Sequence, residues 1–346
     1  MLLQPYQVTE GGKLYIGKSE ELLTGELRDE IRGKVQLIFT SPPFPLNQQK
    51  KYGNVQGEEY IHWLAAFAPL FADLLTPTGS IVIELGNAWE PGSPRQSLLP
   101  LQSLLKFAEE GNLQLCQEFI CHNPTRLPSP AQWVTIERIR VTDSYTRLWW
   151  MSLTDRPKAD NRNVLRPYSD ATKRMHERGQ FNAGRRPSGH YVSKDAFLQD
   201  NGGSIMPNVI ELDPIKEGKS SRLPTNAFSI AHTNSNDYYL RECKKRDKKP
   251  HPARMPLQLI DFFIQFLTDP GDLIFDPFAG SNATGYCAQQ ADRRWISIEA
   301  REDYAVHSEI RFSEAGAACN PPENSSVEQH SIEQKPNEDI DGIVTH

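Results

Sequence analysis

Apolar positions in the first 90 residues form short unbroken runs that alternate with helically spaced stretches. The runs Leu14–Ile16, Val35–Phe39 and Ser80–Leu85 are typical of buried strands. Between the last two runs, the spacing over residues 60–75 predicts a helix, and residues 20–27 predict a shorter one. Strands that alternate with helices predict a parallel sheet covered on both faces, which is an α/β fold.

The same pattern returns towards the C-terminal end. An i, i+3, i+4, i+7 apolar stripe over residues 260–267 predicts an amphipathic helix. Strands are predicted at Leu273–Phe275 and Trp295–Ile298, with a helix over 283–290 between them. Residues 123–254 contain many Pro, Asn, Arg and Ser residues and few periodic runs. We therefore expect a loop-rich region inserted between two halves of one α/β domain.

These patterns divide the chain into four parts. Residues 1–125 and 251–312 are the predicted halves of the α/β domain, and residues 126–250 are the predicted insert. Residues 313–346 combine Pro, Glu, Asn, Ser and Gln with few apolar side chains. A segment of that composition cannot bury enough apolar surface to offset its ordering, so we expect a disordered tail.

Charge is distributed unevenly along the chain. The 346 residues include 38 Lys and Arg against 44 Asp and Glu, and a net charge of -6 argues against a nucleic-acid partner. Residues 313–346 account for this whole excess, with seven acidic residues and one lysine. Residues 126–255, in contrast, hold 24 Lys and Arg against 14 Asp and Glu. Clustered positive charge is what binding to a phosphate backbone requires, although solvated surface charge explains an unselected segment equally well.

Two further classes of protein are disfavoured. No apolar run approaches the roughly 18 residues that a membrane span needs, and the N-terminus lacks the pattern of a signal peptide. We therefore expect a cytoplasmic protein with no membrane partner. The five cysteines include no C-x-x-C pair, so neither a disulfide framework nor a zinc site is indicated, and we predict no metal.

The segment Asp276–Asn282 follows a predicted strand and precedes a predicted helix. Gly280 permits a tight turn and a close approach of a ligand to the backbone, and the helix N-terminus offers unpaired N–H groups. Glu299 ends the next predicted strand, where a carboxylate can accept hydrogen bonds from both hydroxyls of a ribose. The pair favours a nucleoside ligand over an ordinary glycine-containing turn.

The segment Thr40–Phe44, with the sequence TSPPF, lies at the carboxyl end of the second predicted strand. Open α/β sheets place their ligand sites at such ends. Because the two prolines fix φ and lack an N–H group, the loop is rigid and leaves the carbonyls of Ser41 and Pro42 as acceptors. Phe44 adds a flat apolar surface. The segment predicts a site that stacks on a planar ring and accepts hydrogen bonds from an amino group, whereas the prolines alone would indicate only a turn.

The two motifs, in this order, resemble the amino-group DNA methyltransferases of the β class, in which the catalytic motif precedes the S-adenosylmethionine motif. Ser-Pro-Pro in place of Asp-Pro-Pro is similar to the N4-cytosine branch. The resemblance extends over residues 13–312 and includes the stretches 123–130, 157–162, 233–237 and 251–256. It implies a Rossmann-like methyltransferase fold with a circularly permuted motif order, in which the basic insert is the target-recognition region.

The resemblance also implies roles for individual residues. Ser41 and the Pro42 carbonyl would accept the two N–H bonds of a flipped cytosine, and Phe44 would stack on its ring. The implied catalytic residues are Ser41, Pro42, Pro43 and Phe44. The residues implied to hold S-adenosyl-L-methionine are Gly17, Ser19, Asp276, Pro277, Phe278, Gly280, Ser281 and Glu299. Contacts with double-stranded DNA are expected from Arg126, Lys158, Arg162, Arg185, Arg186, Lys244 and Lys245.

The predicted function is methylation of the N4 amino group of cytosine within a short DNA sequence, which would protect that DNA in a restriction–modification system. A cognate restriction endonuclease is the expected functional partner. Methylation of adenine N6 is the nearest alternative. A catalytically inactive DNA-binding relative is another, because Lys18 stands where the family has an acid that bonds the cofactor's adenine amine. A nucleotide-binding protein that acts on small molecules is the third, and it leaves the basic insert unexplained.

Overall fold

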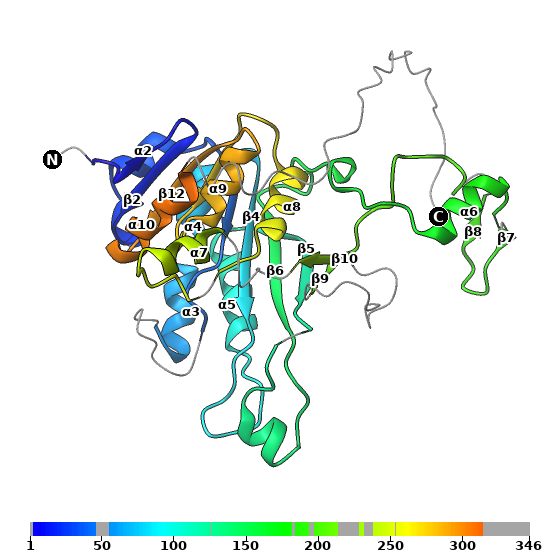
Figure 1. Cartoon of the computed structure of the whole chain (residues 1–346), viewed down its shortest axis with the longest axis horizontal. Helices are drawn as coiled ribbons and strands as arrows, with labels where there is room; N and C mark the ends of the chain where they lie inside the picture. The colour runs from blue at the N-terminus through cyan, green and yellow to red at the C-terminus, as the bar shows by residue number, and fades with distance from the viewer. Residues whose placement is uncertain are drawn as a thin grey trace.

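The computed structural model describes residues 3–45, 55–124, 126–181, 184–193, 197–213, 228–231, 238–252 and 254–313. Within these ranges, ten strands form one large sheet with helices on both faces (Figure 1). The strands are β1 (Gln7–Val8), β2 (Gly12–Ile16), β3 (Val35–Thr40), β4 (Leu75–Gly86), β5 (Gln114–His122), β6 (Tyr145–Ser152), β9 (Val209–Asp213), β10 (Phe228–Ala231), β11 (Leu273–Asp276) and β12 (Arg294–Glu299).

Parallel pairing dominates this sheet, whose order is β1-β2-β12-β11-β3-β4-β6-β5-β9-β10. The neighbours from β2 to β4 are all parallel, whereas β6 lies antiparallel between β4 and β5. Parallel neighbours end at the same edge, so the carboxyl ends of β3, β4, β11 and β12 lie together. The predicted α/β fold with a mostly parallel sheet is confirmed.

Helices cover both faces of the sheet. The helices are α1 (Ser19–Leu22), α2 (Glu26–Ile31), α3 (Gly57–Ala65), α4 (Ala68–Leu74), α5 (Leu99–Glu110), α6 (Asp170–Arg178), α7 (Tyr238–Lys245), α8 (Leu257–Leu267), α9 (Ala283–Gln290) and α10 (Glu302–Ser308), with the short helices η1 (Gln132–Ile136), η2 (Asn161–Val164) and η3 (Glu309–Phe312). Leu37 and Phe39 of β3 join a buried cluster with α8 and α9, while Ile38 joins a second cluster with α3, α4 and α5. Successive residues of a strand point to opposite faces, so a strand covered on both sides is apolar throughout.

Two of the predicted helices are each divided in the structure. Residues 20–27 were expected to form one helix, but α1 ends at Leu22 and α2 begins after Gly25. Residues 60–75 are divided into α3 and α4, and Pro69 lies in the first turn of α4. Proline lacks the N–H that a helix interior uses and is tolerated in a first turn, so the chain begins a new helix there.

The predicted insert contributes strands to the sheet. β6 lies inside residues 126–250, yet it pairs with both β4 and β5, and β9 and β10 extend the sheet beyond β5. The side chains Leu148 and Trp150 enter one buried cluster, and Trp149 and Met151 enter the other. The predicted boundary at residue 125 therefore separates β6 from the two strands with which it pairs. The apolar run Leu148–Met151 lies within a segment whose composition is otherwise polar, and the sequence prediction did not include it.

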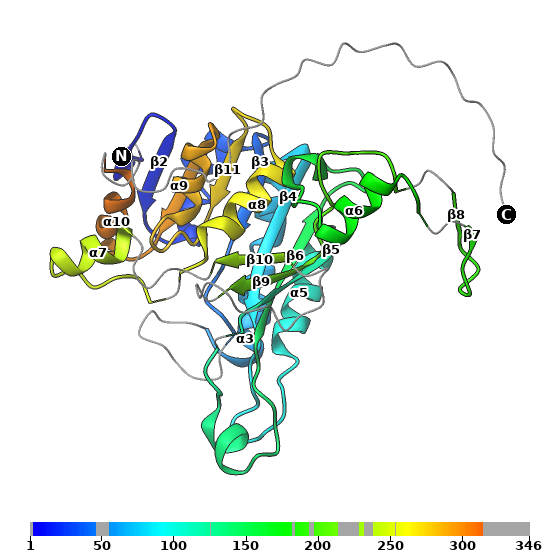
Figure 2. The same cartoon turned by 45° about the vertical axis from the view of Figure 1, so that its right-hand side comes forward.

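The rest of the insert is arranged in smaller pieces. A two-stranded ribbon of β7 (Gly184–Arg185) and β8 (Tyr191–Val192) lies away from the large sheet, beyond α6 (Figure 2). Helix α7 packs instead against η3 through the buried side chains of Tyr239, Cys243 and Ile310. The predicted insert is thus divided between the sheet, an outlying lobe and the flank of the second half.

Three other sequence predictions concern absences or the tail. No helix in the described ranges is long and apolar enough to cross a membrane. The same ranges contain no group of three metal-ligating His, Cys, Asp or Glu side chains, and their four cysteines are free thiols. Residues 314–346, predicted to be disordered, and Cys319 lie outside the described residues.

Candidate active site

Both predicted motifs lie at the edge where the parallel strands end. Thr40 ends β3 and Asp276 ends its neighbour β11. The Thr40 hydroxyl donates a hydrogen bond of 2.8 Å to Oδ1 of Asp276, across 236 positions of sequence. The sheet therefore joins the Thr40–Phe44 motif to the Asp276–Asn282 motif through a direct side-chain contact.

Asp276 is a buried carboxylate that organises the second motif. It accepts hydrogen bonds from the Thr40 hydroxyl, from the Thr284 hydroxyl at 2.7 Å and from the Phe278 N–H at 3.1 Å. Burial raises its pKa to about 6, and these three bonds oppose that rise. The carboxylate thus holds the end of β11, the loop that follows and the first turn of α9 in one arrangement.

The loop between β11 and α9 depends on Gly280. Its φ of +54° lies in the left-handed region, and a Cβ atom there would lie 3.1 Å from the His251 ring. Ser281 is fixed by Arg311, which donates to its carbonyl at 2.8 Å and to its hydroxyl at 3.0 Å. Asn282 caps α9 by accepting a bond of 3.2 Å from the Gly285 N–H. Each residue from 280 to 282 is therefore held in place by its backbone conformation or by a hydrogen bond.

Glu299 ends β12 directly beside this loop. Its carboxylate accepts hydrogen bonds from the Gly280 N–H at 2.7 Å and from the Arg301 N–H at 2.8 Å. Burial raises its pKa to about 7. The Gly17 N–H binds the Glu299 backbone carbonyl at 3.0 Å, and the Ser19 hydroxyl donates to the Pro277 carbonyl. The predicted cofactor residues from both ends of the chain thus meet at one place.

The raised pKa of Glu299 leads to a testable prediction about stability. A carboxyl group whose pKa is raised by folding stabilises the protein below its unfolded pKa, and this contribution is lost as pH rises through the folded pKa. We expect the Tm of the unliganded protein to fall as pH rises from about 4.5 to about 7, and to fall less in Glu299→Gln. Thermal unfolding of both proteins at about pH 5 and about pH 8 measures this. Equal changes in Tm would contradict it.

Ser41 has a partner that the sequence did not reveal. Its side chain forms a hydrogen bond with Glu84, near the end of β4, and the Thr146 hydroxyl of β6 donates to the same carboxyl group at 2.8 Å. Burial raises the pKa of Glu84, while both bonds and the nearby charge of Arg126 lower it. Bonds that lower a carboxyl pKa favour the ionised form, which can only accept. When Glu84 is ionised, the Ser41 hydroxyl is therefore the donor.

The rest of the first motif is held from two sides. The Tyr60 hydroxyl of α3 donates a bond of 2.6 Å to the Pro43 carbonyl. The Phe44 ring lies against Gly86, where a Cβ atom would come within 2.6 Å of the ring. Glycine at the end of β4 thus makes room for Phe44, and Pro42 is buried between these contacts.

Aromatic side chains line the flank of the cofactor loop. The partly exposed ring of Phe278 packs against Trp63 and Phe67, with ring centroids 5.6 Å and 5.3 Å apart. The Trp63 indole N–H donates to Glu20 at 2.6 Å. The sequence indicated Phe278 but not Trp63, because nothing near Trp63 in the sequence marks it as part of this site.

Lys18 does not occupy this site. Its side chain is 69% exposed, and its ammonium group lies 3.7 Å from the carboxylate of Glu21. The cation is therefore turned to solvent, while its neighbours Gly17 and Ser19 make the buried contacts.

The residues predicted to bind DNA are widely separated. Arg126 lies nearest to the first motif: it donates to the Tyr145 carbonyl at 3.2 Å, and its charge acts on Glu84. Lys158 forms ion pairs of 2.9 Å and 2.8 Å with Asp269 and Asp272, just before the amino end of β11. That is the sheet edge opposite the two motifs, so the structure does not support the DNA contact predicted for Lys158.

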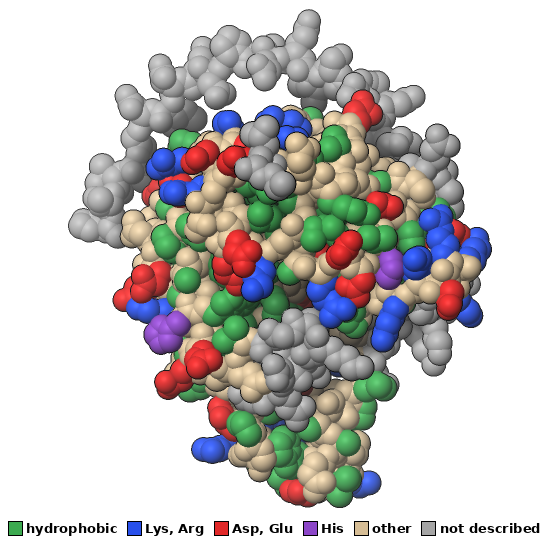
Figure 3. Space-filling view, turned by 90° about the vertical axis from the view of Figure 1, so that its left-hand side faces the viewer, with side chains coloured by type: hydrophobic (Ala, Val, Ile, Leu, Met, Phe, Trp, Pro, Cys, Tyr) green, Lys and Arg blue, Asp and Glu red, His purple; other side chains and the backbone are tan. Residues whose placement is uncertain are grey.

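The other predicted DNA contacts lie at the periphery. Arg162 pairs with Asp160 at 2.6 Å, and Lys245 of α7 pairs with Glu242 at 2.6 Å. Arg185 and Arg186 belong to the outlying ribbon, and Lys244 lies in the last turn of α7. On the face that bears β1, β2 and α10, basic and acidic side chains are intermixed (Figure 3). Among the residues that the structure describes, that face therefore has no patch of only basic or only acidic side chains across it.

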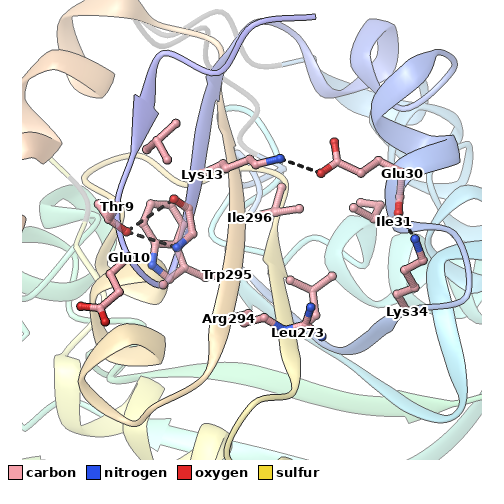
Figure 4. A pocket seen from close by; sticks show the side chains of 13 residues that line it. Thr9, Glu10, Lys13, Glu30, Ile31, Lys34, Leu273, Arg294, Trp295 and Ile296 are labelled. Carbon is pink, nitrogen blue, oxygen red and sulfur yellow. Dashed lines mark hydrogen bonds and ion pairs between the residues drawn. The ribbon is translucent and has the colours of Figure 1, made fainter.

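A pocket at the amino ends of the strands is distinct from this site. It is lined by the starts of β2, β11 and β12, and Lys13 reaches across it to Glu30 at 2.7 Å (Figure 4). None of its lining residues belongs to either motif. In parallel α/β sheets ligands bind at the carboxyl ends of the strands, so we place the site there.

Comparison with known proteins agrees with this geometry. Residues 35–309 match the family model described as DNA methylase, so the chain belongs to the DNA methylases. It is 40% identical to the type II methyltransferase M.PvuII of Proteus hauseri over 311 residues, which cover 89% of this chain and 86% of that protein. It is also 20% identical over 307 residues to M.BamHI of Bacillus amyloliquefaciens, covering 86% of this chain and 56% of that protein.

A solved structure shows the same relationship. The PvuII DNA methyltransferase (cytosine-N4-specific) superposes with a TM-score of 0.66 at 33% identity, covering 90% of this chain and 89% of that one. The family resemblance predicted from the two motifs is confirmed.

Proposed function

We propose that this protein transfers a methyl group from S-adenosyl-L-methionine to the N4 amino group of cytosine in DNA. The observation that carries the proposal is the rigid Ser41-Pro42-Pro43 loop, whose serine is bonded to Glu84 beside the Asp276–Asn282 loop. The similarity to M.PvuII, a cytosine-N4-specific enzyme, favours cytosine over adenine.

The residues at the second motif suit S-adenosylmethionine. Glu299 offers carboxylate oxygens where a ribose would present its hydroxyls, and its bond from the Gly280 N–H holds it beside the loop. Phe278 and Trp63 provide flat apolar surface for a purine ring. When bound, the cofactor supplies an electrophilic methyl group. Lys18 is turned to solvent and does not supply the acceptor that the family's acid provides at this position. The 40% identity to M.PvuII is what favours an active enzyme over an inactive relative.

The chain's own residues prepare the nucleophile. A cytosine amine is a poor nucleophile because its lone pair is delocalised into the ring. The Ser41 hydroxyl gives its only hydrogen to Glu84, so its lone pairs remain to accept one amine N–H, and the Pro42 carbonyl would accept the other. These two bonds draw the nitrogen towards tetrahedral geometry and localise its lone pair. The catalysis is therefore positioning and electrostatic stabilisation.

Glu84 has a second effect on the same step. The amine nitrogen gains positive charge as it is methylated. In its ionised form, Glu84, which is held by Thr146 and linked through Ser41, would place negative charge near that nitrogen. Hydrogen bonds in such a chain polarise one another, so Glu84 makes Ser41 a stronger acceptor.

The relatives support a proposal about the biological setting. M.PvuII and M.BamHI are type II methyltransferases. We therefore place this protein in a restriction–modification system, with a cognate endonuclease as its functional partner and the cytoplasm of a prokaryotic cell as its location. Residues 126–250 would recognise the target sequence, with Arg185, Arg186, Lys244 and Lys245 against phosphates.

Product analysis tests the reaction directly. The purified protein is incubated with methyl-labelled S-adenosylmethionine and DNA of mixed sequence, and the DNA is digested to nucleosides. We expect label in N4-methylcytosine with the wild type and almost none with Ser41→Ala. Label found only in N6-methyladenine would overturn the cytosine assignment.

A further inference from the structure

The described residues between β5 and β6, 123–124 and 126–144, form a lobe that protrudes beyond the carboxyl end of the sheet (Figure 2). It contains the single turn η1, Gln132–Ile136. Its two ends are joined by a hydrogen bond of 2.6 Å from the Asn123 N–H to the Ser144 carbonyl. The lobe is therefore a closed loop on a paired stem.

Large aliphatic side chains are exposed over this lobe. The exposed fractions are 79% for Leu127, 67% for Ile136, 59% for Ile139 and 84% for Val141. Apolar side chains are also visible on the protrusion at the bottom of Figure 3. Single exposed apolar residues are ordinary, but four in one short loop mark a surface that contacts a partner.

A second loop, residues 87–98, supports the lobe. The Arg140 guanidinium lies 3.6 Å from the centre of the Trp89 ring and donates to the Pro94 carbonyl. Asn87 donates to the Asp143 carboxylate at 2.8 Å. These contacts fix the base of the lobe against the 87–98 loop.

The lobe begins beside the catalytic motif. Thr146, two residues beyond its end, holds Glu84, and Arg126 within it lies close enough to lower the pKa of that carboxyl group. Arg138, at the turn after η1, is exposed. A duplex whose cytosine entered the Ser41 site would therefore pass the lobe, with the two arginines near its phosphates.

We propose that the lobe inserts aliphatic side chains between the base pairs next to the target cytosine and so stabilises the flipped-out base. This inference rests on the proposed function. Extrusion of a base costs stacking and pairing, and proteins that deform DNA use apolar wedges of this kind between base steps. Of the four side chains, Ile136, Ile139 and Val141 lie on the half that includes η1 and the turn after it, and they form the wedge.

The test compares a wedge variant on two duplexes. The variant carries Ile136→Ser, Ile139→Ser and Val141→Ser, which are surface changes that leave the core intact. Its matched control is Leu105→Ser, because Leu105 is similarly exposed, at 62%, but lies on α5 outside the lobe. One duplex pairs the target cytosine normally, and the other places an abasic site opposite it, so that the base leaves the helix at little cost.

We expect the wedge variant to lose at least about tenfold in kcat/KM on the paired duplex and less than about threefold on the abasic duplex. The control should match the wild type on both. A pyrrolocytosine at the target position should brighten on binding by the wild type and much less with the variant. Equal losses on the two duplexes, or no loss, would overturn the wedge.

Two further outcomes are informative. If the wild type sediments as a dimer and the wedge variant as a monomer, the lobe joins two copies of this chain and the DNA wedge is wrong. If the wild type methylates neither duplex, the proposed function is wrong. If the wild type methylates them and the wedge variant does so equally well, only the wedge proposal is wrong.

Discussion

Replacement of Ser41 by alanine is expected to lower kcat for cytosine methylation by about 10²–10³-fold. In the proposed mechanism the hydroxyl accepts one of the two amine hydrogens, and its removal also leaves Glu84 with one hydrogen-bond partner fewer. The cofactor loop lies on β11 and is held by Thr40 and Asp276, so affinity for S-adenosylmethionine should stay within about threefold. Single-turnover methylation and calorimetric cofactor binding measure the two quantities. A kcat within threefold of the wild type would show that Ser41 is not an acceptor for the amine.

Glu84→Gln separates the positioning role from the direct one. An amide keeps the size of the side chain but loses the negative charge, and we expect kcat to fall about tenfold with little change in KM. Because Glu84 acts through Ser41, the double variant should be little worse than Ser41→Ala alone. If the two losses multiply instead, Glu84 acts on the nitrogen independently of the serine.

Replacement of Asp276 by alanine is the second large effect, and it concerns stability. The change leaves the Thr40 hydroxyl, the Thr284 hydroxyl and the Phe278 N–H without their acceptor inside a buried site. Unsatisfied buried groups cost about 1–3 kcal/mol each, so we expect a loss of about 4 kcal/mol and no detectable cofactor binding.

Asp276→Asn is the matched control for this prediction. An asparagine of the same size retains one oxygen, which can still accept from Thr40 and from the Phe278 N–H, and the Thr284 hydroxyl can turn to accept from the amide. The expected loss is about 1–2 kcal/mol. Urea unfolding measures both variants, and equal stability of alanine and asparagine would mean that the three bonds do not hold the loop.

Local patterns predicted most elements of the catalytic sheet. The helix over 283–290 and the strands ending at Asp276 and Glu299 were predicted because each shows a single hydrophobic pattern along its length and is bounded by turn residues. β6 was missed for a physical reason. Its apolar run Leu148–Met151 is like that of β3, but no helically spaced stretch flanks it and its neighbours in sequence are loops. Only its pairing with β4 and β5 marks it as a central strand.

The residues of the site also divide into those that the sequence indicated and those that only the structure revealed. The sequence singled out the motif residues Ser41, Gly280 and Glu299 because their chemical types and order are informative without any partner, and their roles stay predictions. Glu84, Thr284 and Trp63 were missed, because each acts on a residue far away in the chain. For Lys158, charge alone predicted a phosphate contact, whereas the fold places two carboxylates within 3 Å of it.

The sequence by itself determined the α/β architecture, the order of the two motifs and the family, because periodicity and residue type are properties of the covalent chain. Only the tertiary structure decided that Ser41 contacts Glu84, that Asp276 holds the loop before α9, and that the aliphatic lobe begins close to Glu84. Those facts depend on which strands become neighbours, and strand order is set by the burial of both faces of the whole sheet. A hydrogen-bond partner 236 positions away has no local signal until that sheet has formed.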